Sequence, residues 1–383
     1  MPWKEIYVMD QKIQMISNWL SGDYSITELS RLHSVSRKTI YKWIERYQND
    51  KENGLRDLSS RPLTCARATP VGMVCEIVFL KNRYPDWGAR KILGWLGKHR
   101  PGQTWPVSST IHDILRRHGL VKTRKKRHHT PPYREPFMKA VQPNEVWSAD
   151  YKGQFRLGCG NYCYPFTMTD NYSRYLLGCH GLAHPAYEPT RHYFAKAFRE
   201  YGLPNAIRTD NGVPFASTGL RGLSKLSVWF IKLGILPERI EKGHPEQNGR
   251  HERMHRTLKA EAIKPPQYSM AAQQREFDRF QRYFNNDRPH GALGQNTPAS
   301  VYKRSNRNYP QKLPVIEYPA HYKVRHIHQG GGLKWANKET YFSGTLAGEY
   351  VGLTEVDNGI WNIYFSFYPV AVLDEKSFTI KSL

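Results

Sequence analysis

A carboxylate stands inside the β-rich stretch Val-Trp-Ser-Ala-Asp-Tyr-Lys (146–152), where the chain turns from helical to strand-forming patterns. A second carboxylate, Asp210, ends the short buried strand of Ile-Arg-Thr-Asp-Asn-Gly (207–212). If these two strands are neighbours in one sheet, Asp150 and Asp210 converge on one site. Carboxylates that share two divalent ions clamp the attacking and the leaving oxygen of an in-line displacement. The pair therefore predicts a site for metal-dependent phosphoryl transfer.

The third carboxylate of this pattern lies on a predicted helix, in His-Pro-Glu-Gln-Asn-Gly-Arg-His-Glu-Arg (244–253). This stretch holds two candidates. Glu246 follows Pro245 at the helix start, where an acidic residue meets the positive end of the helix dipole without needing a catalytic role. Glu252 lies past Gly249 on the helix proper, and we take it as the third member. Singly, a turn-forming Asp or a helical Glu among arginines is structural; the three placements together favour one site.

The segments around these carboxylates predict a mixed sheet of five strands with helices on its faces. Strands and helices follow one another in the order βββ-α-β-α-β-α-α, which excludes an all-parallel doubly wound fold. The predicted strands cover 146–157, 162–169, 172–182, 206–209 and 235–240, and the predicted helices cover 187–201, 220–233, 246–262 and 270–285.

The composition indicates a polyanionic partner. The 383 residues hold 57 Lys+Arg against 33 Asp+Glu, a net charge of +24, whereas a solvated structural surface mixes both signs more evenly. No run approaches the roughly 18 to 20 apolar residues of a membrane span, and no signal peptide follows the start. We therefore expect nucleic acid, and no membrane, as the partner of a chain with roughly two to four domains.

The five cysteines are few and irregularly spaced, which fits a reduced, cytosolic setting. Cys159 and Cys163 flank Gly-Asn-Tyr and are half of a zinc-site spacing. No second Cys or His pair at that spacing follows, so we expect no zinc. We interpret both as small apolar residues at a hairpin.

Residues 10–48 predict three short helices, the last two forming a helix-turn-helix in which Ser36 caps the last helix. The exposed side of this helix is cationic near its N-terminus, where such helices meet base edges and phosphates. A small helical bundle with a basic outer face is the alternative. The candidate DNA contacts are Arg37, Lys38, Thr39, Tyr41 and Lys42.

Residues 71–119 repeat this layout after a segment rich in helix breakers at 54–70, which predicts a linker. Two tandem units would read an extended site on duplex DNA. The cationic run that follows predicts phosphate tracking, with a solvated linker as the alternative. Further candidate DNA contacts are Arg90, Ser108, Ser109 and Thr110, then Lys122, Arg124, Lys125, Lys126 and Arg127, and, on the helix of Glu252, Arg250, Arg253, Arg256 and Lys259.

The C-terminal part predicts short strands after a Pro-interrupted segment. Asp-Asn-Gly (357–359) between two strand-forming runs is a strong hairpin signal, and we expect a small all-β, SH3-like barrel. The predicted domains are an all-α tandem of helix-turn-helix units at 1–53 and 71–121, a basic linker at 122–143, an α/β catalytic core at 144–300 and the barrel at 310–383.

The chain resembles the superfamily of retroviral integrases and insertion-sequence transposases, whose core is RNase H-like and whose catalytic set is Asp-Asp-Glu. The matching segments are Glu-Val-Trp-Ser-Ala-Asp (145–150), Thr-Asp-Asn-Gly (209–212), Pro-Glu-Gln-Asn-Gly-Arg-His-Glu-Arg (245–253) and Phe-Asn-Asn-Asp-Arg-Pro-His (284–290) with Leu293 and Thr-Pro (297–298). The retroviral members carry an N-terminal His-His-Cys-Cys zinc module that this chain lacks, which favours the bacterial transposase branch.

The resemblance implies a DNA transposase that binds the terminal inverted repeats of its own element. Asp150, Asp210 and Glu252 would be the catalytic residues and the ligands of two Mg²⁺ ions, with Mn²⁺ as a possible substitute. The enzyme would cut the 3′ ends of the element and join them to target DNA. It would act on double-stranded DNA as a homo-oligomer, at least a dimer, in the bacterial cytoplasm and on the nucleoid when bound to DNA.

Two other functions compete with this one. A metal-dependent nuclease of the same fold would cut without joining, and a DNA-binding regulator would use the helix-turn-helix units alone, although the intact carboxylates argue against it. Among residues near the motifs, we interpret Asp170 as a hairpin residue. We expect His244 and His251 on the surface, and Trp147 and Tyr151 in the core.

Overall fold

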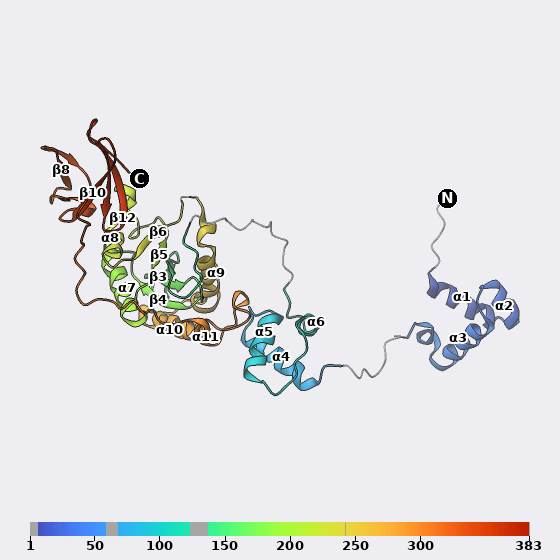
Figure 1. Cartoon of the computed structure of the whole chain (residues 1–383). Coiled ribbons are helices and arrows are strands. Elements are labelled where there is room, and N and C mark those ends of the chain that lie inside the picture. The colour runs from blue at the N-terminus through green and yellow to red at the C-terminus, as the bar shows by residue number, and fades with distance from the viewer. Residues whose placement is uncertain (1–6, 59–67, 123–136, 242, 383) are drawn as a thin grey trace. The chain divides into compact units, whose positions relative to one another are not determined.

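The structure is a computed structural model that describes residues 7–58, 68–122, 137–241 and 243–382. The chain divides into two compact units, Met1–Thr69 and Pro70–Leu383 (Figure 1). We describe each by itself. Among the described residues, no helix is long and apolar enough to cross a membrane.

The first unit is the predicted three-helix arrangement. Its elements are α1 Val8–Leu20, α2 Ile26–Leu32, α3 Arg37–Asp50 and the 3₁₀ helix η1 Lys51–Leu55. The Ser36 hydroxyl accepts the backbone N–H of Thr39 at 3.2 Å, as the predicted cap requires. The predicted linker was wrong at its start, because Leu55 is buried in the core of this unit and the Lys12 Nζ donates to its carbonyl at 3.2 Å.

A second set of three helices opens the second unit and matches the predicted repeat. Its elements are α4 Val71–Arg83, α5 Ala89–His99 and α6 Ser108–Arg117. Its buried core includes Trp87, and Tyr283 of the central α/β domain packs against it. The Trp87 indole N–H donates to the Tyr283 hydroxyl at 2.9 Å. Gly94 lets α5 come close to Gln295, since an added Cβ would lie 2.7 Å from the Gln295 Cβ. These helices are thus packed directly on the core domain.

The central sheet is mixed, as predicted, and follows the order β4-β3-β1-β5-β6 with β2 also paired to β3. β1 pairs antiparallel with β3 and parallel with β5, and β5 and β6 are parallel. The predicted first strand ends early, and its last residues form β2. The strands are β1 Val146–Tyr151, β2 Phe155–Arg156, β3 Tyr162–Asp170, β4 Leu176–Leu182, β5 Ala206–Thr209 and β6 Leu236–Arg239.

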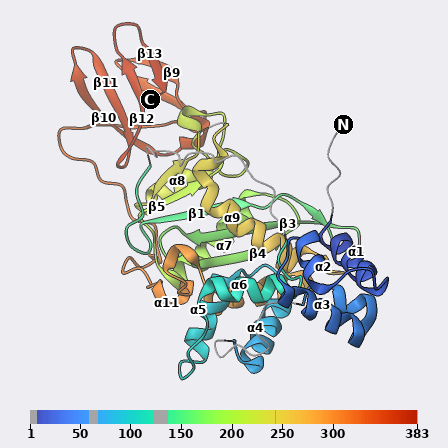
Figure 2. The same cartoon turned by 90° about the vertical axis from the view of Figure 1, so that its right-hand side faces the viewer.

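Helices cover both faces of this sheet, and Figure 2 shows α9 crossing over β1 and β3. α7 and α8 pack on the face that carries Trp147 and Phe166, and α9 and α10 pack on the face that carries Cys163 and Cys179. The helices and turns are α7 Tyr187–Tyr201, η2 Leu220–Gly222, α8 Lys225–Lys232, η3 Pro245–Asn248, α9 Gly249–Leu258, the π-helical turn η4 Lys259–Ile263, α10 Met270–Asn286, η5 Gly291–Leu293 and α11 Pro298–Val301.

The C-terminal domain is all-β. A five-stranded antiparallel sheet has the order β13-β12-β11-β10-β7, and β8 and β9 form a separate hairpin. The predicted Asp-Asn-Gly turn joins β10 to β11, with Gly359 at φ 77°. The elements are β7 Lys323–His326, β8 Gly332–Trp335, β9 Lys338–Tyr341, η6 Gly344–Leu346, β10 Tyr350–Asp357, β11 Ile360–Phe365, β12 Tyr368–Asp374 and β13 Thr379–Ser382. Its core continues into α8 through Val228 and Ile231.

Candidate active site

The two aspartates of the predicted site belong to neighbouring strands, Asp150 inside β1 and Asp210 directly after β5. β1 and β5 run parallel with Ala149 opposite Thr209, so Asp150 and Asp210 come next to each other where β5 ends. Alternate residues of a strand face opposite sides of a sheet. Because Ala149 is buried against α7 and α8, Asp150 faces the α9 side. The predicted adjacency of these two strands is confirmed.

Glu252 approaches this site from α9. The helix begins at Gly249 after the 3₁₀ turn η3, so Glu252 lies in its first turn. Its carboxylate is close enough to raise the pKa of Asp150. The alternative, Glu246, lies in η3, and its side chain is outside the described residues.

The electrostatics of Asp150 show that the carboxylates are gathered together. Burial and, to a smaller extent, the nearby Asp210 and Glu252 carboxylates together raise the pKa of Asp150 to about 7, while Lys152 acts in the opposite direction. Burial also raises the pKa of Asp210. Buried acids that repel one another resist ionisation together. A cation placed among them would relieve that repulsion.

Polar groups from α9 and the residue before it lie near the Asp150 carboxylate. The Asn248 amide donates to Oδ2 of Asp150 at 3.5 Å, and His255 Nδ1 lies 3.8 Å from the same oxygen. The Asn248 side-chain oxygen is buried and has no hydrogen-bond partner among the described residues. On the other strand, Asp210 Oδ1 accepts the Gly212 N–H at 3.2 Å. This turn orders the Asp210 carboxylate at the end of β5.

Two buried histidines connect α9 to β3 behind Asp150. The Thr167 hydroxyl lies 2.7 Å from Nε2 of both His251 and His255, and the Thr169 hydroxyl lies 2.9 Å from His251 Nδ1. Burial lowers the pKa of His251 to about 3 and lowers the pKa of His255 still more, so both rings are neutral at pH 7. Ligand atoms of Asp150, His251 and His255 lie within 4.8 Å of one another.

The expectation that His251 is a surface residue was wrong, and the sequence analysis did not single out His255. The signal was available. His251, Met254, His255 and Leu258 are spaced as one buried face of a helix, and the histidines occupy polar positions of that face because threonines oppose them. The helical period therefore identifies these residues better than residue type does.

The remaining residues near the motifs are structural, as expected. Asp170 is fully buried and accepts the N–H of Asn144 at 2.8 Å and the N–H and hydroxyl of Ser173 at 2.7 and 2.6 Å. It therefore closes the hairpin between β3 and β4. Trp147 is fully buried, and Tyr151 packs against the same core.

Predicted DNA contacts from two distant segments line one groove. It has a volume of about 850 Å³ and lies between α9 and the starts of α5 and α6. The predicted contacts in its lining are Arg90, Ser108, Ser109, Arg253 and Arg256. Thr110, Lys122, Arg250 and Lys259 do not line this groove, and Arg124, Lys125, Lys126 and Arg127 lie outside the described residues.

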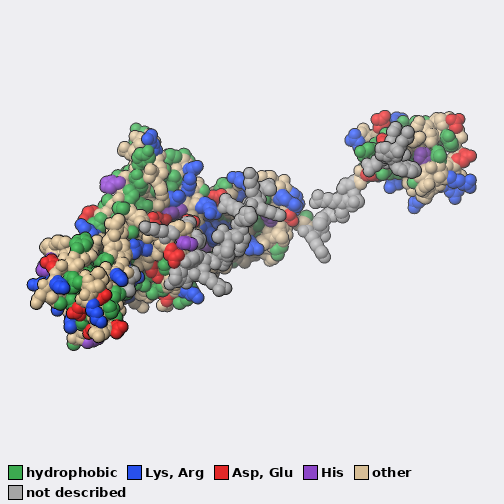
Figure 3. All heavy atoms as spheres, turned by 90° about the horizontal axis from the view of Figure 1, so that it is seen from above, with side chains coloured by type: hydrophobic (Ala, Val, Ile, Leu, Met, Phe, Trp, Pro, Cys, Tyr) green, Lys and Arg blue, Asp and Glu red, His purple; other side chains and the backbone are tan. Residues whose placement is uncertain are grey.

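The predicted contacts of the first unit lie together on α3. Arg37, Lys38, Tyr41 and Lys42 are exposed, and Thr39 is half-buried with its hydroxyl 2.9 Å from that of Ser36. Figure 3 shows Lys and Arg side chains in blue along one side of this unit. The face is suited to phosphate and base contact.

Family models define the class of protein. Two models of the integrase core domain match residues 140–245 and 233–298. A helix-turn-helix domain model matches residues 11–62, and a homeodomain-like domain model matches residues 39–115. The carboxylate site described above therefore lies in an integrase core domain that follows helix-turn-helix domains.

Two proteins of bacterial insertion elements are similar to part of this chain. The chain is 29% identical to the uncharacterized 39.2 kDa protein of insertion element IS476 from Xanthomonas euvesicatoria, over 47% of this chain and 51% of that protein. It is 28% identical to the uncharacterized 31.7 kDa protein of IS407 from Burkholderia multivorans, over 49% and 66%. It thus spans about half to two thirds of the length of these relatives. The chain is therefore similar, over about half of its length, to proteins of bacterial insertion elements, and its central part matches integrase core domain models.

Solved structures with a similar arrangement include the integrase catalytic core domain of HTLV-2, in complex with magnesium. It is 16% identical over 43% of this chain and 100% of that chain, with a TM-score of 0.35.

Proposed function

We propose that this protein is a DNA transposase that binds the terminal inverted repeats of its element, cuts the 3′ ends and joins them to target DNA. The observation that carries the proposal is the parallel pairing of β1 with β5, which puts Asp150 beside Asp210, with Glu252 on α9 near enough to affect the Asp150 carboxylate. Three neighbouring acids in a strongly basic chain are suited to bind metal cations that contact a phosphate group of the substrate. The groove lined by Arg253 and Arg256 begins on the same helix, α9.

The residues present fit divalent metal ions. Their oxygen donors are those that Mg²⁺ prefers, and their mutual repulsion would be offset by bound positive charge. Asp150, Asp210 and Glu252 would hold two such ions; Mn²⁺ is the expected substitute. Such ions polarise a phosphoryl group and stabilise both the entering and the leaving oxygen. His251 and His255 direct their Nε2 atoms at Thr167, so we assign them to positioning.

The chain's own residues would then position the reactants. Asn248 and His255 hold Oδ2 of Asp150, and the turn at Gly212 holds Asp210. Arg253 and Arg256 would contact phosphates of the substrate strand. Water would attack the end phosphate first, and the freed 3′-OH would attack target DNA next. Both are direct displacements without a covalent enzyme intermediate, in which positioning and charge supply the catalysis.

The other parts of the molecule supply DNA recognition and assembly in this proposal. The faces of α3 and of α5 and α6 would read the repeats, and the C-terminal all-β domain would be an SH3-like barrel. Two element ends must be joined in one reaction, so we expect at least a homodimer on double-stranded DNA. The domain boundaries proposed from the sequence are retained, except that the first domain extends to Leu55.

A strand-transfer assay tests the function. The full chain is incubated with Mg²⁺, target plasmid and a duplex that carries the end of its element, with either a blunt or a pre-cut 3′ end. We expect cutting of the blunt duplex and joining of both duplexes. Cutting without joining would identify a nuclease, and binding without either reaction would identify a regulator.

A further inference from the structure

A second cavity lies beside the candidate active site, and most of its charged lining residues are cations. Its volume is about 450 Å³, and it lies where the end of β3, α9, α5 and the segment after α10 meet. Its basic residues come from four separate places in the sequence, so only the folded chain brings them together. They are Lys91, Arg174, Arg250, Arg253 and Arg288. We call this cavity the basic pocket.

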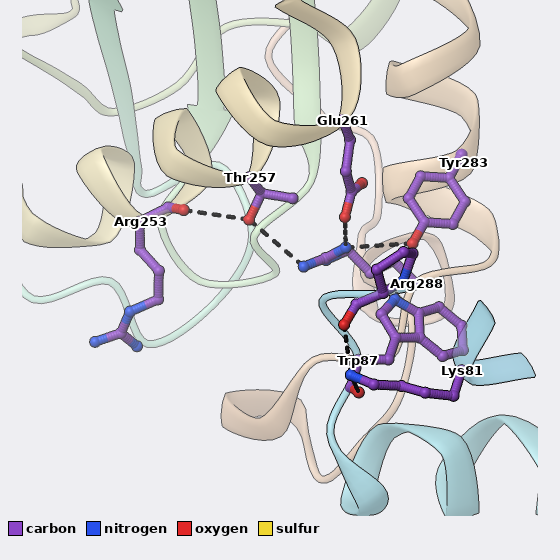
Figure 4. A network of polar contacts seen from close by, with 8 residues as sticks. Lys81, Trp87, Arg253, Thr257, Glu261, Tyr283 and Arg288 are labelled. Carbon is purple, nitrogen blue, oxygen red and sulfur yellow. Dashed lines mark hydrogen bonds and ion pairs between the residues drawn. The ribbon is translucent and has the colours of Figure 1, made fainter. Parts of the chain in front are cut away.

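One of these cations is fixed by the protein itself. Arg288 is buried and forms an ion pair with Glu261, and its guanidinium also lies 3.2 Å from the Tyr283 hydroxyl and 3.5 Å from the Thr257 hydroxyl (Figure 4). A buried charge needs this kind of pairing. Arg288 therefore forms the floor of the basic pocket and holds α9 to the segment that follows α10.

Arg250, Arg253 and Lys91 are not neutralised in the same way among the described residues. Arg250 and Arg253 have no ion pair among the described residues, and Figure 4 shows the Arg253 side chain directed away from the Arg288 network. Arg174 donates to the carbonyl of Asn171. Lys91 is half-buried, and its burial and the nearby Arg288 lower its pKa to about 8. Positive charge therefore exceeds negative charge in the basic pocket.

The acidic and polar groups of the lining do not cancel this excess. The Asp170 carboxylate is occupied by three donors from Asn144 and Ser173. His290 also lines the basic pocket, and its Nε2 is buried without a hydrogen-bond partner among the described residues. Burial, with the nearby Lys91 and Arg288, lowers the pKa of His290 to about 3, so its ring is neutral near pH 7, and Nε2 can donate to a ligand in the tautomer that carries its proton there. An anion is the ligand that would satisfy both the unmatched charge and the unpartnered nitrogen.

The surroundings indicate which anion. The basic pocket shares Lys91, Arg253 and Thr257 with the groove between α9 and α6, so a ligand in the pocket can continue into the groove as a chain. Thr169 lines the pocket and also bonds to His251, the neighbour of Glu252. The pocket is therefore next to the candidate catalytic carboxylates. A nucleic-acid strand has both the charge and the continuity that this path requires.

We propose that the basic pocket holds one backbone phosphate of the DNA strand that enters the active site, clamped between Lys91 of the second helix-turn-helix and Arg250 of α9. This inference rests on the proposed function, whose DNA substrate it assumes. The pocket would place the strand relative to the carboxylates and would also couple reading of DNA by α5 and α6 to chemistry at α9.

A double-mutant cycle on the full chain tests this, because two cations that share one phosphate are energetically coupled. Binding of the element-end duplex is measured in EDTA, where no chemistry occurs. Lys91→Gln and Arg250→Gln should each weaken binding of the duplex about tenfold. The fold loss of affinity in the double variant should be clearly smaller than the product of the two single fold losses. Lys91→Arg should retain most of the affinity.

The matched control uses Arg282 in place of Arg250, since Arg282 is an exposed arginine of α10 outside the basic pocket. Lys91→Gln and Arg282→Gln should combine multiplicatively. Ethylation interference should then reveal one phosphate whose modification impairs wild-type binding but has little effect on either pocket variant. Thermal unfolding checks that the variants are folded.

Multiplicative losses for Lys91 and Arg250, or different interfering phosphates for the two variants, would overturn the pocket while leaving cutting and joining by the wild type intact. If the wild type binds but neither cuts nor joins, the proposed transposase function fails, and the binding cycle still decides whether the pocket holds a phosphate.

Discussion

The two helix-turn-helix units have the same sequence pattern but different surroundings. The first closes its core with its own residues, including Leu55 from η1. The core of the second is completed by Tyr283 of α10, and Tyr84, Trp87 and Tyr283 form an aromatic stack with ring centroids 4.1 and 5.5 Å from Tyr84. The same motif is therefore a self-contained unit in the first case and is packed against the central α/β domain in the second.

The strongest test separates chemistry from DNA reading. Asp150→Asn should reduce cutting and joining by at least about 10³-fold, because several kcal/mol of charge stabilisation are removed. Repeat binding in a gel shift should stay near the wild-type level, since it comes from the helical units. A variant that still cuts would remove Asp150 from the site. Asp210→Asn should behave in the same way.

The second test decides which glutamate is the third carboxylate of the candidate active site. Glu252→Gln should abolish Mg²⁺-dependent strand transfer, because only this carboxylate is placed near Asp150 on α9. Glu246→Gln is the matched control and should keep most of the activity. The opposite result would transfer the role to Glu246.

A matched pair of core substitutions tests the comparison of the two units directly. Leu29 and Leu96 are both fully buried, one in each helical core, so Leu29→Ala and Leu96→Ala should each cost about 2–5 kcal/mol of local stability. At saturating DNA, only Leu96→Ala should slow strand transfer, because its core supports the groove beside α9. Equal slowing by both variants would show that the core of the first unit also supports strand transfer.

The carboxylate cluster predicts a pH effect on metal-free protein. Because the pKa of Asp150 is raised to about 7, its contribution to stability is present below about pH 4 and is lost as pH rises through 7. Between these pH values the wild type should lose about 2–4 kcal/mol relative to Asp150→Asn. Thermal unfolding in EDTA measures the loss, and added Mg²⁺ should reverse it. Parallel pH profiles for the two proteins would exclude the cluster.

The smallest effect is expected for substitutions on α3 of the first helix-turn-helix unit. Lys38→Ala with Lys42→Ala should lower repeat affinity at low salt and reduce the salt slope by about 0.9 for each DNA phosphate that the variant no longer neutralises. Strand transfer at saturating DNA should be unchanged. Arg275→Ala with Arg282→Ala on α10 removes the same charge and serves as the control. Equal slopes for the two double variants would assign α3 no special role.

The sequence by itself determined the elements and the acidic residues of the site. Apolar periods of helices and strands identify α3, α7 and β5 closely, because these patterns depend on local geometry and burial. Asp150 and Asp210 could be paired because they stand at comparable positions of strands predicted to be neighbours. Ser36 and Gly359 could be assigned from local backbone chemistry alone.

Only the tertiary structure determined what depends on contacts between distant segments. His251 and His255 are buried because Thr167 and Thr169 of β3 lie opposite them, a pairing across the fold that no local pattern contains. Likewise, Lys91 and Arg250 line one pocket because Tyr283 and Arg288 bring α5 and α9 together. Helical and strand periods are local properties of the chain, whereas burial and electrostatic environment are set by whichever residues the fold places nearby.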